Sequence, residues 1–163
     1  MPRALNQYLI ALGSNLGNRL RFLESARDLI AVKIGPISKW AQPIATDPLG
    51  PADQQFLNSV LLCESDLEAE AVMAILLAIE NELGRVRLQK WGNRTIDLDI
   101  LLCMLASGQM LKSQTAFLSL PHPEMHLRDF VLIPAAEIAG DWIHPLFGKS
   151  IHELLAQYAF AKI

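Results

Sequence analysis

The chain has 163 residues, of which 52% are hydrophobic and 19% are charged, a composition typical of a folded globular protein rather than a disordered one. Its net charge of −3 argues against general nucleic-acid binding, and no apolar run approaches the roughly 18 residues that span a membrane. We therefore expect one cytoplasmic domain over residues 1–163 that has no signal peptide. We also expect a monomer that acts on small molecules, although composition does not determine the oligomeric state.

Short apolar runs and turn residues divide the first half of the chain into a strand, a helix and two further strands. We predict these elements at residues 8–12 (strand), 20–30 (helix, ended by Gly35 and Pro36), 37–46 (strand) and 56–64 (strand). Pro43 has no backbone N–H, so it favours an edge or a bulge within the strand over 37–46. Residues 47–55 form a loop by composition.

The second half of the chain begins with a helical face over residues 72–83, for which Ser65 and Glu68 fit a capping box. The remaining predicted elements are a basic loop over 85–93, a strand over 95–103, a short helix over 130–139 and a C-terminal helix over 150–159. Ser150 and Glu153 fit a second capping box at the start of that last helix. Residues 104–120 carry no clear pattern.

The order of these elements indicates the fold class. Strand, helix, strand, strand, helix, strand is the βαββαβ order of the ferredoxin-like folds. We therefore predict an α/β (α+β) protein whose antiparallel sheet carries helices on one face, with a C-terminal helical extension. The other face would then be open to a ligand or to loops.

Two aspartates, Asp97 and Asp99, interrupt the otherwise apolar strand "TIDLDILLC". Because side chains alternate along a strand, Ile96 and Leu98 would point toward the helices and both carboxylates would point the other way. Their Cα atoms would lie about 6.6–6.8 Å apart. The pair could simply be solvated on an exposed sheet face, but two oxygen donors in this arrangement also suit Mg²⁺ bound together with substrate phosphates.

A group of basic residues precedes these aspartates, and it is notable on an acidic protein. Its members are Arg85, Arg87, Lys90 and Arg94. Cations beside metal-binding carboxylates indicate a polyphosphate site, although the chain has no P-loop motif. Trp91 lies within the same loop, where it would either stack on a ligand or pack on the protein surface.

The histidines and cysteines give weaker indications. His122 and His126 have the four-residue spacing of a zinc pair, but Pro123 lies between them and no third ligand is evident. His144 and His152 are expected to be structural or to lie on the surface. Cys63 and Cys103 lack the spacing of a zinc or redox motif, so we expect buried free thiols.

Four segments of the chain together resemble the 6-hydroxymethyl-7,8-dihydropterin pyrophosphokinase family of folate biosynthesis. "GRVRLQKWGNRTIDLDILL" resembles the signature segment of the family, and "YLIALGSNLGNR" resembles its N-terminal strand and first loop. "TDPLGPADQQFLNSV" resembles its second loop and the strand that follows, and "LPHPEMHLRDFVLIPAAEIAGDWIHP" resembles its C-terminal segment. The resemblance implies a single pyrophosphokinase domain over residues 1–163, which transfers pyrophosphate from ATP to the pterin hydroxymethyl group and releases AMP.

The resemblance also implies roles for individual residues. Asp97 and Asp99 would hold two Mg²⁺ ions that bridge the ATP phosphates and the attacking hydroxyl. Arg85 and Arg94 would reach the phosphates when the loop closes. The residues expected to bind the pterin are Thr46, Leu49, Phe56, Asn58, Trp91 and Phe130. The residues expected to bind ATP, the co-substrate, are Arg87, Ile100, Ser119, His122 and Arg128.

Two other readings remain open from the residues alone. A nucleotide-sugar transferase would use the Asp-x-Asp pair in a similar way, although it usually needs a larger nucleotide-binding fold. A ferredoxin-like regulatory module would bind a small ligand between its loops, and its basic loop would be a solvated surface. Hydrolysis of a nucleotide sugar would identify the first, and a lack of magnesium-dependent nucleotide binding would favour the second.

Overall fold

The structure, a computed structural model, describes residues 5–46, 55–84 and 95–161. A five-stranded antiparallel sheet forms its centre, with the strand order β2–β4–β1–β5 and with β3 also paired to β4. Its strands are β1 (Asn6–Ser14), β2 (Ile37–Trp40), β3 (Ile44–Thr46), β4 (Phe56–Ser65) and β5 (Asp97–Met104). This order confirms the predicted ferredoxin-like core.

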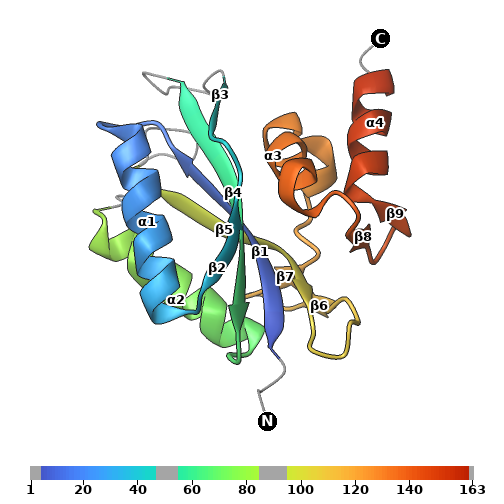
Figure 1. Ribbon diagram of the computed structural model, residues 1–163, viewed down its shortest axis with the longest axis horizontal. Coiled ribbons are helices and arrows are strands. Elements are labelled where there is room, and N and C mark those ends of the chain that lie inside the picture. Colours follow the sequence, from blue (N-terminus) through green and yellow to red (C-terminus); the bar gives the residue numbers. More distant parts are fainter. Residues whose placement is uncertain (1–4, 47–54, 85–94, 162–163) are drawn as a thin grey trace.

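Two helices, α1 (Arg19–Lys33) and α2 (Ala69–Glu82), cover one face of the sheet (Figure 1). They bury side chains such as Leu23, Ile30 and Leu76 against the sheet. The same apolar cluster contains Ile96, Leu98 and Ile100, so the predicted direction of these side chains is confirmed. The two aspartates between them therefore face away from α1 and α2.

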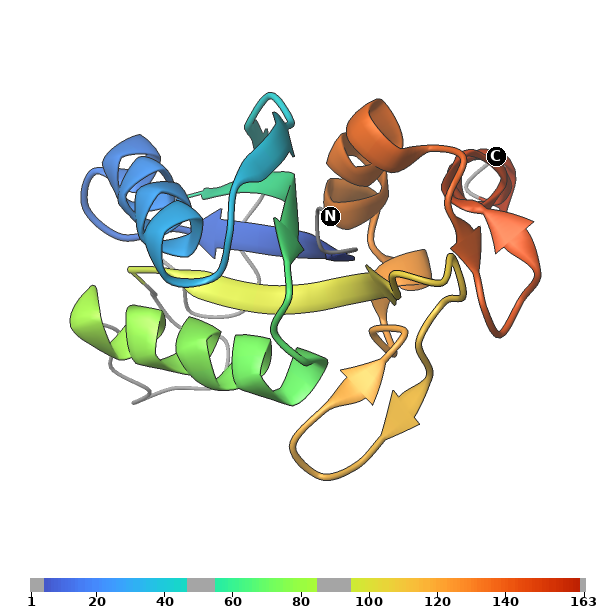
Figure 2. The ribbon, with the colours of Figure 1, turned by 60° about the horizontal axis from the view of Figure 1, so that its bottom comes forward.

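The C-terminal part of the chain covers part of the opposite face. Figures 1 and 2 show α3 (Asp129–Ala139) and α4 (Ile151–Ala161) on the side of the sheet away from α1 and α2. Leu132 of α3 packs in one cluster with Leu9, Leu62 and Leu101 of the sheet. The face that the sequence analysis predicted to be open is therefore only partly open, because α3 covers the part that carries these leucines.

Short elements connect these layers. A hairpin of β6 (Ser113–Gln114) and β7 (Ser119–Leu120) occupies part of the segment that carried no clear pattern. A short 3₁₀ helix, η1 (Met125–Leu127), then leads into α3. A second hairpin, β8 (Ile143–His144) and β9 (Lys149–Ser150), leads into α4. Among the described residues, no helix combines the length and the apolar character needed to cross a bilayer.

Of the two predicted capping boxes, the one at α4 is present and the one at α2 is not. At α4, Ser150 N–H donates to Glu153 Oε1 over 3.0 Å and Glu153 N–H donates to Ser150 Oγ over 3.1 Å, which confirms that capping box. The box predicted for α2 is wrong, because Ser65 Oγ instead donates to the carbonyl of Ile34 and accepts from Leu67 N–H.

The strand predicted over 37–46 is divided in the structure. Residues 41–43 separate β2 from β3, and both strands pair with β4. The interruption contains Pro43, which cannot donate to a ladder. The predicted bulge or edge at this proline therefore takes the form of a break between two short strands.

Candidate active site

The two aspartates lie at the start of β5, where the strand runs beside β1. Asp97 is paired with Gly13 and Asp99 with Ala11, and both aspartates are partly exposed. Because Leu98 and Ile100 point into the core beneath α1 and α2, both carboxylates project from the other face. Both partners on β1 are small, since Gly13 has no side chain and Ala11 carries only a methyl group.

One row of residues runs across the sheet through this point. Gly13 is paired with Asp97 on one side and with Asn58 of β4 on the other. Since directly opposed residues of antiparallel strands have Cα atoms about 4.5–5.5 Å apart, the backbones of Asn58 and Asp97 lie about 9–11 Å apart. The face therefore presents an amide on one side and two carboxylates on the other, with a floor of Ala11 and Gly13 between them.

Asn58 is held in one orientation by its neighbours. Its Nδ2 donates to Thr46 Oγ1 over 2.8 Å, and only 9% of the residue is exposed. A Cβ added to Gly13 would lie 2.9 Å from Asn58 Oδ1 and 3.6 Å from the Phe56 ring. Thr46, Phe56 and Asn58 thus gather around Gly13, at the end of the sheet that carries the aspartates.

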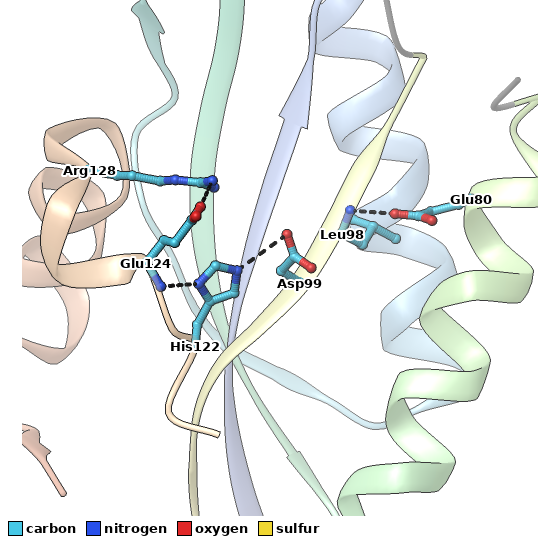
Figure 3. A network of polar contacts seen from close by, with 6 residues as sticks. All are labelled: Glu80, Leu98, Asp99, His122, Glu124 and Arg128. Atoms are coloured by element: carbon cyan, nitrogen blue, oxygen red, sulfur yellow. Dashed lines mark hydrogen bonds and ion pairs between the residues drawn. The ribbon is translucent and has the colours of Figure 1, made fainter. Parts of the chain in front are cut away.

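His122 contacts β5 on the same side as Asp99 (Figure 3). Its backbone N–H donates to the carbonyl of Leu101 over 2.9 Å, and its Nδ1 accepts from Glu124 N–H over 3.1 Å. The neutral imidazole therefore carries its proton on Nε2, which lies 3.9 Å from Asp99 Oδ2.

The surroundings of His122 favour its neutral form. Burial lowers the pKa of His122 most, and the nearby Arg128 lowers it further, while Glu124 and Asp97 act in the opposite direction. The net pKa lies below the ordinary value of 6.5, so at neutral pH the ring presents an N–H donor toward the carboxylates.

Arg128 and Phe130 extend the site toward α3. Arg128 forms an ion pair with Glu124, and its guanidinium carbon lies 5.7 Å from the centre of the Phe130 ring. Figure 3 shows His122, Glu124 and Arg128 together on one side of Asp99. A cationic group, an imidazole N–H and two carboxylates are therefore available around one part of the sheet.

Comparison with known proteins identifies the family. Residues 9–140 match the model of the family described as 7,8-dihydro-6-hydroxymethylpterin-pyrophosphokinase (HPPK). The match covers most of the chain and includes both aspartates, Asn58 and His122. The chain belongs to this family. It is therefore an enzyme of the pyrophosphokinase family, and its relatives are transferases that bear the family name.

Two curated relatives show how far the similarity extends. The 2-amino-4-hydroxy-6-hydroxymethyldihydropteridine pyrophosphokinase of Synechocystis sp. is 36% identical over 160 residues, which cover 96% of this chain and 78% of the relative. The protein of the same name from Haemophilus influenzae is 38% identical over 156 residues, which cover 94% of each chain.

A solved structure shows the same fold. A crystal structure of an HPPK-DHPS protein in complex with substrates superposes with a TM-score of 0.77 at 14% identity, and the match covers 98% of this chain. This chain spans 45% of that longer polypeptide. At such low identity the likeness supports the pyrophosphokinase fold alone.

Some residues predicted for the nucleotide site lie further from the carboxylates or face another way. The side chain of Ile100 is buried beneath α1 and α2, so any contact with a nucleotide on the open face would have to come from its backbone. Ser119 is exposed on β7, in the hairpin beside β5. Leu49, Arg85, Arg87, Trp91 and Arg94 lie outside the described residues, as does Lys90.

His122 and His126, whose spacing would suit a zinc pair, face different groups in the structure. His122 faces Asp99, whereas the ring of His126 packs against Phe147, with centroids 4.7 Å apart, and near His144 at 6.1 Å. Within the described residues, no group of three or more His, Cys, Asp or Glu side chains is arranged to hold a metal. Two carboxylates on one face fit Mg²⁺, which commonly binds through one or two carboxylates and substrate phosphates.

Sequence reasoning missed one residue that touches β5. Glu80 of α2 is 1% exposed, and its Oε2 accepts from Leu98 N–H over 2.8 Å. A signal was present, because Glu80 follows Leu76 by four residues and precedes Leu83 by three, which places it on the apolar face of the helix. A buried carboxylate on such a face requires a partner.

Proposed function

We propose that this enzyme transfers the pyrophosphoryl group of ATP to the hydroxymethyl oxygen of 6-hydroxymethyl-7,8-dihydropterin in a Mg²⁺-dependent reaction that releases AMP. The observation that carries the proposal is the pair of carboxylates, Asp97 and Asp99, on the face that also holds Asn58. The reaction is a step of folate biosynthesis. We further propose that residues 1–163 form one pyrophosphokinase domain, while its cytoplasmic location and monomeric state stay predictions.

Asp97 and Asp99 would hold the metal, with two Mg²⁺ ions expected. Magnesium bound there with the ATP phosphates would neutralise charge on the transferred group and lower the pKa of the attacking alcohol. Both carboxylates are partly exposed on one face, opposite the small residues Gly13 and Ala11 of β1. A pair of carboxylate oxygen donors supports magnesium over zinc, which usually takes His or Cys ligands.

The pterin would bind over Gly13, on the side away from the aspartates. Asn58 offers an amide that can both donate and accept hydrogen bonds, and Thr46 orients it. Phe56 and Phe130 would enclose the flat ring between two apolar faces. Leu49 and Trp91, which lie outside the described residues, are proposed to complete this pocket.

ATP would lie along the other side of the carboxylates. His122 presents its Nε2–H toward Asp99, and Arg128 carries a permanent charge suited to phosphate oxygens. Ser119 and the backbone of Ile100 are proposed to contact the nucleotide. Arg85, Arg87 and Arg94 are proposed to add positive charge, with Arg85 and Arg94 reaching the phosphates.

The chemistry then needs positioning more than a dedicated base. The hydroxymethyl oxygen attacks the β-phosphorus, the bond from that phosphorus to the oxygen shared with the α-phosphate breaks, and AMP leaves with this oxygen. The alcohol proton passes to solvent or to a phosphate oxygen. By holding the pterin beside Asn58 and ATP beside the carboxylates, the protein would convert a reaction between two molecules into one within a complex.

Release of AMP tests the proposal. Purified protein is incubated with ATP and Mg²⁺, with or without 6-hydroxymethyl-7,8-dihydropterin, and AMP and ADP are quantified by chromatography. The proposal predicts AMP only when both the pterin and Mg²⁺ are present. ADP in place of AMP, or AMP formed at the same rate without the pterin, would contradict it.

A further inference from the structure

Glu80 contacts the strand that carries the two aspartates, at the residue between them. Its Oε2 accepts from the backbone N–H of Leu98 over 2.8 Å. Figure 3 shows this bond on the side of β5 opposite to His122. Glu80 and Leu98 are 1% and 0% exposed, so water has little access to this backbone group, and the carboxylate satisfies a donor that would otherwise be costly to bury.

This bond exists because β5 is an edge strand. β5 pairs with β1 in the described sheet, and successive residues of a strand direct their N–H groups to opposite sides. The N–H of Leu98 therefore points away from β1, toward α2. Within residues 5–46, 55–84 and 95–161, no strand pairs with this side of β5. There the backbone N–H of Leu98 is bonded by a side chain from α2.

A second bond holds β5 on the far side of Asp99. His122 N–H donates to the carbonyl of Leu101 over 2.9 Å. Leu101 is the extra residue of a bulge, since Leu9 is paired with Leu102 and Ile10 with Ile100. The bonds at Leu98 and Leu101 thus bracket Asp99, and the bond at Leu98 is the one that lies between the two carboxylates.

From this geometry we infer that Glu80 is a positioning residue for the metal-binding carboxylates. Its carboxylate fixes the edge of β5 at Leu98, so that the side chains of Asp97 and Asp99 stay directed to one face at a constant separation. The inference rests on the proposed function, because that function supplies the metal. Mutation of residues that support metal-ligating groups typically lowers metal affinity or activity about 10–100-fold.

Three variants test this role. Glu80→Ala removes the acceptor, Glu80→Gln keeps an acceptor oxygen of the same reach, and Glu82→Gln is the control on the same helix. Glu82 is exposed, and its carboxylate pairs with Lys33 of α1 over 3.1 Å. Hydrogen exchange of the Leu98 amide is measured in metal-free protein. Binding of α,β-methylene-ATP is then measured by calorimetry with and without Mg²⁺.

The inference predicts a distinct result for each variant. In Glu80→Ala the Leu98 amide exchanges faster, and the Mg²⁺-dependent affinity for the analogue falls about 10–100-fold, while the affinity without Mg²⁺ stays near the wild-type value. Glu80→Gln recovers most of the loss, and Glu82→Gln matches the wild type. If Glu80→Ala does not fold, Glu80→Asp, which shortens the reach by one methylene, takes its place with a smaller loss in the same direction.

Two outcomes would overturn the inference, and both can be distinguished from a failure of the proposed function. Wild-type affinity in Glu80→Ala with Mg²⁺ would show that the bond has no effect on the carboxylates. An equal loss with and without Mg²⁺ would show general loosening of the fold rather than positioning. If the wild type itself binds the analogue equally with and without Mg²⁺ and forms no AMP, the proposed function fails, and the metal-positioning role fails with it.

Discussion

Gly13 lies between the two halves of the proposed site, and replacing it by alanine should disturb the pterin half alone. The added Cβ would lie 2.9 Å from Asn58 Oδ1 and 3.6 Å from Phe56 Cδ1. Ordinary contacts of carbon with carbonyl oxygen are about 3.3–3.6 Å, so the amide must move by roughly half an ångström. Gly13 is not at positive φ, so alanine adds no backbone strain.

The magnitude follows from what holds Asn58. Moving the amide stretches its 2.8 Å bond to Thr46, and the net value of such a bond is about 0.5–1.5 kcal/mol. We expect a loss of about 1 kcal/mol in the free energy of unfolding. A displaced Asn58 amide would make poorer hydrogen bonds to the pterin. A cost of about 1–3 kcal/mol for such poorly satisfied groups predicts a loss of pterin affinity of about 5–150-fold.

Calorimetry measures this effect directly. Pterin is titrated into protein saturated with α,β-methylene-ATP and Mg²⁺, and binding of the nucleotide analogue alone serves as the control, with a change of less than about twofold expected. The variant is then made in an Asn58→Ala background. Because Gly13→Ala acts through Asn58, it should have little further effect on pterin binding there. Equal losses for pterin and nucleotide, or full additivity with Asn58→Ala, would refute the reasoning.

Three further predictions concern metal binding, acid stability and the C-terminal helix. Asp97→Ala should lower kcat by several orders of magnitude, because the charge on the transferred phosphates is no longer stabilised. The melting temperature measured by calorimetry should be unchanged. A large drop in that temperature would instead show that Asp97 has a structural role. Burial, with His126 nearby, lowers the pKa of His144 below 6.5, so the unfolded chain binds more protons below about pH 6.5 and the free energy of unfolding should fall as the pH drops there. In thermal melts from pH 7.5 to 5.5, His144→Phe should make the melting temperature depend less on pH. An unchanged pH dependence would exclude His144 as its source. Ser150→Ala should lower the melting temperature by about 2–4 °C through loss of the cap and leave kcat unchanged, and a lower kcat would link α4 to the site.

Alternation along the strand was sufficient to predict the carboxylate pair. The period of two in β5 depends only on backbone geometry, and it correctly separated Asp97 and Asp99 from Ile96, Leu98 and Ile100. The end of the strand was less predictable, since the bulge at Leu101 breaks the period. A bulge depends on pairing with β1, which local sequence does not specify.

Features that arise from packing between distant elements could not be predicted. Helical spacing shows that Glu80 is on the apolar face of α2, but its bond to Leu98 depends on how α2 is placed along β5. The capping box assigned to Ser65 failed for a similar reason, because the carbonyl of Ile34 accepts its hydroxyl. The His126, His144 and Phe147 ring cluster joins η1 to the β8–β9 hairpin, and no sequence pattern indicated it.

Identification of the products tests the central claim most directly. Wild-type protein is mixed with ATP, Mg²⁺ and 6-hydroxymethyl-7,8-dihydropterin, and phosphorus NMR follows the fate of the β- and γ-phosphates. The account predicts equal amounts of AMP and a pterin whose hydroxymethyl oxygen carries a diphosphate, with no reaction after chelation of Mg²⁺. Formation of ADP with a pterin monophosphate, or of AMP with free pyrophosphate and unmodified pterin, would contradict it.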